Sequence, residues 1–383
     1  MKKTLLTICL VWMCFSLSAQ KIIDLSGKWS FSIDRQDNGE KEKWFSHTLN
    51  DCINLPGSMP EKLKGDEVTA KTQWTGSLYD SSYYYNPYME KYRKEGNIKF
   101  PFFLTPDKHY VGAAWYQKEV NIPADWKGER ILLFLERPHI ETTVWVNGQK
   151  TGMQNSLCVP HQYDITHYVR PGKCTITIRV DNRIKEINVG PDSHSITDQT
   201  QGNWNGIVGR ICLQTTPKTY FDDIQIYPEP EQKLARVKVV IKGTGTAKVK
   251  LSAESFNTDK KHIVPAIQQE IKLNKGVTET EMVLPMGNDM LLWDEFHPAL
   301  YKLKAEVTNG KKTEIKEIQF GMRRFEIKGK WFYVNGRKTQ LRGTVENCDF
   351  PLTGYAPMDV ESWERVFRIC RSYGLNHMRF HSF

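Results

Sequence analysis

Most of this chain is built from short segments that alternate apolar and polar residues, or that form short apolar runs, and this restricts it to folds made mainly of β-strands. Between about residues 22 and 218 the clearest segments are 29–33, 131–135, 143–146 and 175–180. Asn147-Gly148, directly after one of them, is a strong signal for a tight hairpin turn. Many short strands separated by Pro, Gly and Asn predict a β-sandwich or jelly roll for residues 21–218.

One long excursion, near residues 60–113, departs from this alternation. Aromatic residues crowd into it: Tyr79, Tyr83, Tyr84, Tyr85, Tyr88, Tyr92, Phe100, Phe102, Phe103 and Tyr110. A loop of this length is usually functional or disordered, and the aromatic content argues against disorder. Two interpretations stay open. The segment is a lid or subsite wall whose rings stack on sugars, or it is an insertion that packs against its own domain or the next one.

A second β-rich block occupies residues 219–323. Its clearest strands are predicted at 235–241, 247–253, 277–284 and 300–307. About a hundred residues of short strands predict an immunoglobulin-like β-sandwich.

The remaining residues, 324–383, predict a strand, a helix and a second strand. A turn at Asn335-Gly336 precedes a strand over 339–345, and Asp359 can cap a helix that runs to Tyr373. The segment 375–381 then reads as the second strand. Because parallel strands need such a crossover, this unit predicts the opening of a larger α/β domain.

The first twenty residues have the pattern of a secretory signal peptide. A basic start, Met1-Lys2-Lys3, is followed by a short apolar stretch and by small residues that suit cleavage. We therefore expect a soluble secreted or periplasmic protein rather than a lipoprotein, with no membrane span in the later sequence. The formal net charge of +9 comes without long blocks of Lys or Arg, which argues against nucleic acid as a partner.

The cysteines outside this leader are widely and irregularly spaced, and they match no metal-binding pattern. They are Cys52, Cys158, Cys174, Cys212, Cys348 and Cys370. Export permits disulfides, but a chain with this much core does not need them. We expect buried free thiols, no metal site and no cofactor.

Several phrases occur in an order that resembles glycoside hydrolase family 2, on its β-galactosidase-like side. They are Trp145-Val146-Asn147-Gly148 with Gly152; Tyr163-Asp164-Ile165-Thr166; Asn203-Trp204-Asn205-Gly206-Ile207 with Gly209-Arg210-Ile211; Trp293 with Pro298 and Leu300-Tyr301; Phe320-Gly321-Met322-Arg323; Asn335-Gly336 with Leu341-Arg342-Gly343; and Met378-Arg379-Phe380-His381. Each phrase alone is weak, but the ordered set is specific.

The resemblance implies a jelly-roll sugar-binding domain, an immunoglobulin-like domain and a (β/α)8 barrel that carries the chemistry. It also implies an exo-acting retaining β-glycosidase of carbohydrate catabolism that uses two glutamates. In the family these glutamates follow the fourth and seventh barrel strands, whereas 324–383 holds only the first two. We therefore expect both catalytic glutamates to be absent from this chain, and the chain alone to be inactive.

Some sugar-binding residues are implied by the same resemblance. Arg379 and His381 lie at the end of the second barrel strand, and Glu346 and Asn347 follow the first. The alternative for Arg379 and His381 is that they merely line the barrel interior. In the first domain, Asp198 matches an aspartate that binds a sugar hydroxyl.

Trp204, close to Asp198 in the sequence, is the last of the predicted site residues. It fits a sugar contact and core packing equally well. The expected partner is a β-galactoside or a related non-reducing-end glycoside, and the sequence does not indicate which sugar it is or what the oligomeric state is.

Three functions stay open: an exported β-glycosidase, a non-catalytic carbohydrate-binding or interaction protein, and an inactive gene fragment. Turnover of a nitrophenyl glycoside would distinguish the first from the others, and calorimetry with glycosides would distinguish the second from the third.

Overall fold

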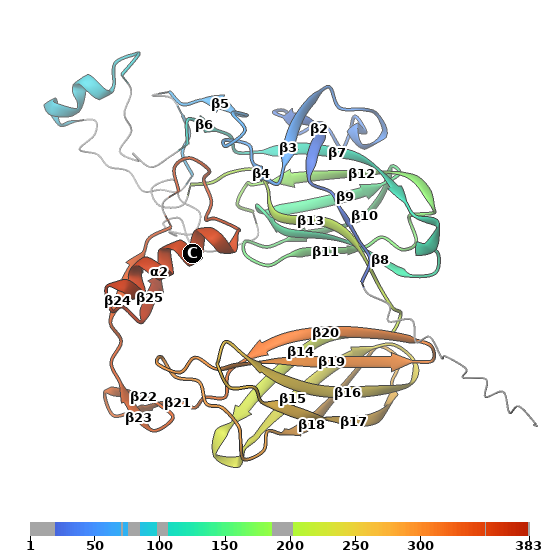
Figure 1. Ribbon diagram of the computed structural model, residues 1–383. Coiled ribbons are helices and arrows are strands. Elements are labelled where there is room, and N and C mark those ends of the chain that lie inside the picture. The colour runs from blue at the N-terminus through green and yellow to red at the C-terminus, as the bar shows by residue number, and fades with distance from the viewer. Residues whose placement is uncertain are drawn as a thin grey trace, which may run out of the picture. The chain divides into compact units, whose positions relative to one another are not determined.

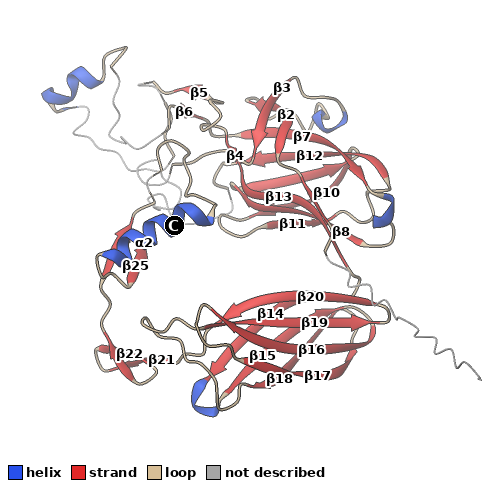
Figure 2. Cartoon of the chain, viewed as in Figure 1, coloured by secondary structure: helices blue, strands red, loops and turns tan. Residues whose placement is uncertain are grey.

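The computed structural model describes residues 20–69, 72–75, 85–97, 106–185, 202–348 and 350–381. The described chain is mainly β, as predicted (Figure 2). It divides into two compact units. One holds Pro217–Ile327 and Tyr333–Arg337 together with Gln20, and the other holds Lys21–Thr216, Lys328–Phe332 and Lys338–Phe383. Each unit is described by itself below.

The larger unit contains two antiparallel sheets. The five-stranded sheet has the order β1-β13-β8-β11, with β4 also paired to β13, and the six-stranded sheet has the order β10-β9-β12-β7-β2-β3. The strands of the first sheet are β1 (Ile22–Asp24), β4 (Gly57–Ser58), β8 (Arg130–Pro138), β11 (His161–Asp164) and β13 (Gly206–Thr216). Those of the second are β2 (Gly27–Asp34), β3 (Asp51–Leu55), β7 (Ala113–Ile122), β9 (Glu141–Val146), β10 (Gln149–Asn155) and β12 (Gly172–Asp181).

Alternation along the strands builds one core shared by both sheets. Leu133 and Leu135 of β8 enter it, and so do Val144 and Val146 of β9. Because side chains alternate between the faces of a strand, the residues between these positions point away from the core. The predicted hairpin turn between β9 and β10 is confirmed, since Asn147 and Gly148 both have positive φ, 50° and 78°.

The outer face of the six-stranded sheet is also covered. The connection from β2 to β3, residues 35–50, lays Trp44 and Phe45 over Trp115 and Trp145 of the sheet. The Phe45 and Trp145 rings stack with centroids 5.2 Å apart. We call this connection the strap. It explains why alternate residues of β7, β9 and β12 on this outer face are buried as well.

Smaller elements complete this unit. They are β5 (Asp66–Glu67), paired with β6 (Lys108–His109), and the 3₁₀ helices η1 (Trp44–Ser46), η2 (Pro87–Tyr92) and η3 (Ala124–Trp126). In the aromatic excursion Tyr85 and Tyr88 are exposed, whereas Tyr110 is buried. Its other tyrosines and phenylalanines, apart from Tyr92, lie outside the described residues, so both interpretations of the excursion stay predictions.

The smaller unit also pairs two antiparallel sheets, with the orders β14-β15-β18 and β17-β16-β19-β20. The strands are β14 (Tyr220–Glu229), β15 (Leu234–Lys242), β16 (Gly245–Phe256), β17 (Ile263–Leu273), β18 (Val277–Pro285), β19 (Leu300–Asn309) and β20 (Lys312–Phe320), with a 3₁₀ turn η4 (Pro230–Gln232). One apolar core, with Tyr301 fully buried, joins side chains of both sheets. All four strands predicted for this block are present.

The predicted strand–helix–strand unit is present. Strands β24 (Gly343–Glu346) and β25 (His377–Phe380) pair in parallel, and helix α2 (Val360–Ser372) lies between them in sequence and beside them in space (Figure 1). Asp359 caps the helix by accepting a hydrogen bond from the Ser362 backbone. A small sheet precedes the unit: β21 (Phe325–Lys328), β22 (Trp331–Val334) and β23 (Arg337–Thr339).

The single strand predicted over 339–345 is wrong in its extent, because the chain leaves extended pairing between Thr339 and Gly343. The Asn376 side chain forms hydrogen bonds with backbone groups in this gap. It accepts from the Arg342 N–H at 2.8 Å and donates to the Gln340 carbonyl at 3.2 Å. A side chain thus replaces the ladder bonds that a continuous strand would make.

The six cysteines of the described chain are free thiols. Cys174, Cys212 and Cys348 are buried, but Cys52 and Cys158 are exposed. The prediction of buried thiols is therefore wrong at those two positions. Cys52 points outward from β3, an edge strand, and Cys158 lies in the turn before β11. Within the described residues, no helix combines the length and apolar character that crossing a membrane requires.

Candidate functional site

The two faces of the β24–β25 pair differ in what covers them. Phe380 packs on α2, with ring centroids 5.5 Å from Trp363 and 6.5 Å from Phe367. Because alternate side chains point to opposite faces, Arg379 projects away from α2. Val345, its register partner, is 49% exposed, and Arg379 is exposed too. We call this uncovered side the Val345–Arg379 face.

The other predicted residues of this region lie at the ends of the same two strands. His381 directly follows β25, and its backbone N–H donates to the Glu346 carbonyl at 2.8 Å. Asn347 is exposed just after β24. Glu346 is the register partner of Phe380, so its side chain leaves the strand on the side of α2, where its Oε1 accepts from the Cys348 N–H at 2.9 Å. The structure therefore brings Arg379 and His381 to one place and turns Glu346 away from them.

Three successive residues of the loop between β24 and α2 contact residues at or next to the ends of β4 and β13. The Ser58 hydroxyl donates to the Thr353 carbonyl at 2.5 Å, and the Tyr355 hydroxyl donates to Glu61 Oε2 at 2.8 Å. Between them, Gly354 lies against the ring of Trp204. Burial, followed by the hydrogen bond to Glu61, raises the pKa of Tyr355 well above its ordinary value, so its hydroxyl stays a donor at neutral pH.

Trp204 is only 2% exposed and is surrounded by protein. The His139 ring stacks on it, with centroids 4.5 Å apart and planes 15° from parallel, and Tyr355 lies 5.4 Å away. This environment supports the core-packing interpretation weighed from the sequence, and a direct sugar contact stays a prediction. Burial, and then the nearby Arg137 cation, lowers the pKa of His139 to about 3, so this histidine is neutral.

Three buried asparagines, Asn182, Asn203 and Asn205, join neighbouring chain segments through hydrogen bonds. Asn182 and Asn203 exchange hydrogen bonds of 3.0 and 2.9 Å, and Asn205 donates to the carbonyls of Gly112 and Val180. Sequence reasoning did not give these residues a role. The phrase Asn203-Trp204-Asn205-Gly206 could have indicated this role. An asparagine beside a buried tryptophan is itself expected to be buried, and a buried amide needs hydrogen-bond partners for its donors and acceptor. Asp198, predicted to bind sugar, lies outside the described residues.

A charged cluster at the end of β12 lies close to these asparagines in sequence. Asp181 is fully buried and pairs with Arg179, Arg183 and Lys185 at 3.0, 2.5 and 2.8 Å. Burial opposes ionisation of Asp181, but the hydrogen bonds from Arg183 and Lys185 outweigh it and hold its pKa well below the ordinary value. The cluster is therefore ionised at neutral pH, and it ties the end of the strand down.

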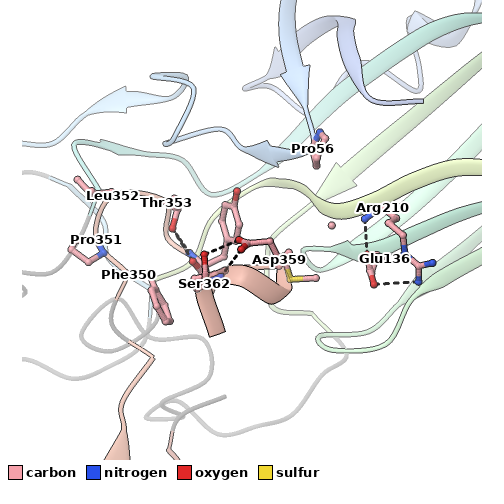
Figure 3. A pocket seen from close by; sticks show the side chains of 13 residues that line it. Pro56, Glu136, Arg210, Phe350, Pro351, Leu352, Thr353, Asp359 and Ser362 are labelled. Atoms are coloured by element: carbon pink, nitrogen blue, oxygen red, sulfur yellow. Dashed lines mark hydrogen bonds and ion pairs between the residues drawn. The ribbon is translucent and has the colours of Figure 1, made fainter. Parts of the chain in front are cut away.

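A pocket of about 700 Å³ opens beside the fastened loop. Figure 3 shows Phe350, Pro351 and Leu352 on one side of it and Glu136 with Arg210 on the other. The walls are mostly apolar. The Glu136 carboxylate accepts from the Arg210 backbone N–H at 2.6 Å, at the point where a bulge in β13 breaks the register with β8. The pocket offers apolar and aromatic contact with one ion pair at its rim.

The clearest aromatic pair on a sheet face is closed to ligands. Trp115 and Trp145 are 0% and 2% exposed beneath the strap, so neither ring offers a free surface for stacking. Across the described residues, no three His, Cys, Asp or Glu side chains gather as metal ligands would.

Comparison with protein families decides what this architecture is. Residues 22–217 match the family described as glycosyl hydrolases family 2, sugar binding domain, and residues 219–323 match glycosyl hydrolases family 2. The chain belongs to glycoside hydrolase family 2.

Curated relatives of this family 2 chain are named for two sugars. It is 24% identical over 301 residues to a β-galactosidase of Thermoanaerobacter pseudethanolicus, covering 74% of this chain and 38% of the relative. It is 28% identical over 283 residues to a putative β-glucuronidase of Formosa agariphila, covering 72% and 33%. It is 23% identical over 394 residues to human β-glucuronidase, covering 93% and 53%. The family 2 chain therefore spans between a third and about half of these relatives.

Solved structures show the same fold. A β-glucuronidase of Ruminococcus gnavus in complex with C6-substituted uronic isofagomine superposes with a TM-score of 0.66 at 19% identity, covering 95% of this chain and 55% of that one. The same enzyme in complex with D-glucuronic acid gives a TM-score of 0.66 at 18% identity, covering 94% and 56%. This likeness establishes the fold of the family 2 chain, and function is argued separately below.

Proposed function

We propose that this chain is the sugar-recognising part of a retaining β-glycosidase of family 2. In this proposal residues 21–218 are a jelly-roll sugar-binding domain, residues 219–323 an immunoglobulin-like domain, and residues 324–383 the start of a (β/α)8 catalytic barrel. Export through a cleaved leader, residues 1–20, to the periplasm or the exterior is part of the same proposal.

The observation that carries the proposal is the placement of Arg379. It is the next-to-last residue of the parallel strand β25, on the face opposite the helix that packs on that strand. In (β/α)8 barrels the helices lie outside, and catalytic and binding residues come from the carboxyl ends of the strands. Parallel sheets are usually covered on both faces, and this proposal therefore takes the uncovered Val345–Arg379 face as the barrel interior.

Arg379 suits recognition of an anionic or hydroxyl-rich sugar. A guanidinium has a fixed fork of donors that matches a carboxylate in a bidentate way and also donates to hydroxyl oxygens. In this proposal His381 and Asn347 add donors and acceptors at the same strand ends, and Asp198 adds one from the first domain. The named relatives indicate β-galactosides and β-glucuronides as the classes to examine.

Retaining hydrolysis needs two carboxyl groups on opposite sides of the glycosidic bond, one as acid and base and one as nucleophile. Within β24 and β25, no carboxylate shares the face of Arg379, since Glu346 leaves its strand toward α2. This observation favours a second candidate function, carbohydrate binding without turnover, for the chain as printed.

Hydrolysis assays test which of the two holds. The purified chain is incubated with nitrophenyl β-galactoside and nitrophenyl β-glucuronide, with buffer as the blank. We expect no release of nitrophenol above the blank. Turnover that scales with protein concentration would instead assign the complete β-glycosidase activity to this chain.

A further inference from the structure

We propose that Glu61 and Tyr355 are positioning residues, through which the sugar-binding domain holds the loop between β24 and α2 in the geometry that sugar recognition requires. This inference rests on the proposed function and adds a specific task for the first domain. That task is to fix a loop at the strand ends, and it is separate from contacting sugar itself.

The acceptor of the Tyr355 hydroxyl is itself held in place. Glu61 Oε2 accepts from Tyr355 at 2.8 Å, and Glu61 Oε1 pairs with the Lys62 ammonium at 2.6 Å. The Ser58 N–H approaches the same Oε2 at 3.4 Å, and the Glu61 N–H donates to the Ser58 hydroxyl at 3.2 Å. The Glu61 carboxylate is therefore held by Ser58 and Lys62, independently of its contact with the loop.

The turn that holds Glu61 follows β4, a strand of the first sheet. Ser58 is fully buried at the end of β4, which pairs with β13 at Gly206 and Ile207. From that position its hydroxyl reaches the Thr353 carbonyl. A hydrogen bond from a buried, strand-bound residue restrains the loop more tightly than one from a flexible surface side chain, because the donor loses little further freedom.

The ring of Tyr355 adds a second restraint. It lies 5.4 Å from the buried Trp204 ring, and Gly354, with a φ of 83°, lies beside the same indole, which an added Cβ would meet at 3.4 Å. A left-handed conformation at this point suits glycine. Three successive residues, 353 to 355, thus contact the domain through a carbonyl, a backbone surface and a side chain.

The consequence concerns the strand end next to this loop. The loop begins at Asn347, directly after Glu346, and loops without such restraints open easily. Binding and catalysis at a strand end lose efficiency when groups move by about 1 Å. Loosening residues 353–355 should therefore weaken sugar binding at this strand end.

The test compares Tyr355→Phe, which removes only the hydroxyl, with the wild-type chain. Tyr373→Phe is the matched control, because Tyr373 is 82% exposed at the end of α2. A hydrogen bond to a charged group should raise the opening constant roughly 10-fold when lost. We expect amide hydrogen exchange in residues 350–357 to be faster by about that factor in Tyr355→Phe and unchanged in Tyr373→Phe.

Two Glu61 variants test whether a conservative replacement restores the loop contact. Glu61→Ala removes the acceptor, whereas Glu61→Gln keeps an oxygen that can accept from Tyr355. Loop exchange and the dissociation constant for a nitrophenyl β-glycoside should both be closer to wild type in Glu61→Gln than in Glu61→Ala. A merely structural contact would change the exchange rate without changing the dissociation constant.

The outcomes separate this inference from the proposed function. If the wild-type chain binds and Tyr355→Phe exchanges as slowly as wild type, the restraint does not exist and the inference is overturned. It is also overturned if the loosened variant binds with the wild-type dissociation constant. A wild-type chain that binds no glycoside contradicts the proposed function itself, and the positioning role falls with it.

Discussion

Asn182 and Asn203 face each other across two buried hydrogen bonds, although 21 residues separate them in the sequence. Asn182 Oδ1 also accepts from the Gly112 N–H at 2.8 Å, and its amide donates to the Tyr110 carbonyl. The pair holds together the two points between which the segment carrying Asp198 runs. An amide with this many partners is a structural clamp.

Replacing this clamp should be costly. Asn182→Ala leaves the Gly112 N–H and the Tyr110 carbonyl unpaired inside the protein, and we expect a loss of about 2–3 kcal/mol in the free energy of unfolding. Asn288→Ala, at an exposed side chain that accepts only from Lys233 in the described contacts, should change it by no more than about 0.5 kcal/mol. Urea unfolding followed by tryptophan fluorescence measures both, and equal values for the two variants would contradict the clamp.

Gly206 occupies a place that no other residue fits. Its φ is 148°, and an added Cβ would lie 2.5 Å from the Gly57 carbonyl oxygen, which is backbone and cannot move aside. Gly206→Ala should therefore destabilise the chain by about 2 kcal/mol or more.

Gly148→Ala is the matched control for this substitution. Gly148 also has a positive φ, 78°, but an added Cβ meets nothing within 4 Å. It should cost only about 1 kcal/mol, from the left-handed backbone alone. Thermal unfolding of the two variants side by side checks the order, and a reversed order would refute the close approach of β4 and β13.

Because Asp181 lies at the centre of a buried charged cluster, replacing it with asparagine should lower the free energy of unfolding substantially. Asp181→Asn removes the buried carboxylate from Arg179 and Arg183 and leaves them the exposed Asp37 as their shared partner, so we expect a loss of about 2–3 kcal/mol in the free energy of unfolding. Asp125→Asn, at an exposed pair with Lys21, should have no measurable effect.

The pH dependence of the same carboxylate has a definite sign. Because its pKa in the folded chain is below the unfolded value near 4, its contribution is present above pH 4 and is lost as the pH falls below that value. Free energies of unfolding measured at several pH values for the wild-type chain and for Asp181→Asn test this pH dependence. A wild-type profile identical to that of Asp181→Asn below pH 5 would rule the contribution out.

Two buried histidines predict acid sensitivity at a higher pH. Burial lowers the pKa of His139 to about 3 and that of His161 to about 4, against an ordinary value of 6.5. The folded state thus binds fewer protons than the unfolded one, so stability is complete above pH 6.5 and falls as the pH drops toward 4. At pH 5 each histidine should cost about 2 kcal/mol relative to pH 7.

His139→Phe separates one of these contributions. It keeps an aromatic ring against Trp204 and removes the titrating group, so its stability should fall less between pH 7 and pH 5 than that of the wild-type chain. Chemical unfolding at the two pH values gives the comparison, and parallel losses in both proteins would show that folding does not lower the pKa of His139.

Local signals in the sequence predicted local structure well. Asn147-Gly148 gave the hairpin, because few other residues adopt two left-handed conformations in succession. Asp359 and Gly374 bracketed α2 through capping chemistry. The placement of Arg379 follows from period-two alternation once Phe380 is known to contact the helix.

Features that depend on distant residues escaped that reasoning. The strap has no periodicity, and the packing of its Trp44 and Phe45 depends on Trp115 and Trp145, which lie on strands far along the chain. The Ser58–Thr353 contact joins residues 295 positions apart. Trp204 could equally have been a sugar platform, and its burial against the rings of His139 and Tyr355, which supports the packing interpretation, depends on residues far from it in the sequence.

The measurement that tests the account most directly is calorimetric titration of the 383-residue chain with nitrophenyl β-glucuronide and β-galactoside, repeated with Arg379→Gln. We expect the wild-type chain to bind one of the two, and Arg379→Gln to bind it roughly 10-fold or more weakly, because a hydrogen bond from a charged group is lost. Arg371→Gln, in the last turn of α2, should bind like wild type. No heat from the wild-type chain with either glycoside, or equal affinity in Arg379→Gln, would contradict sugar recognition at this strand end.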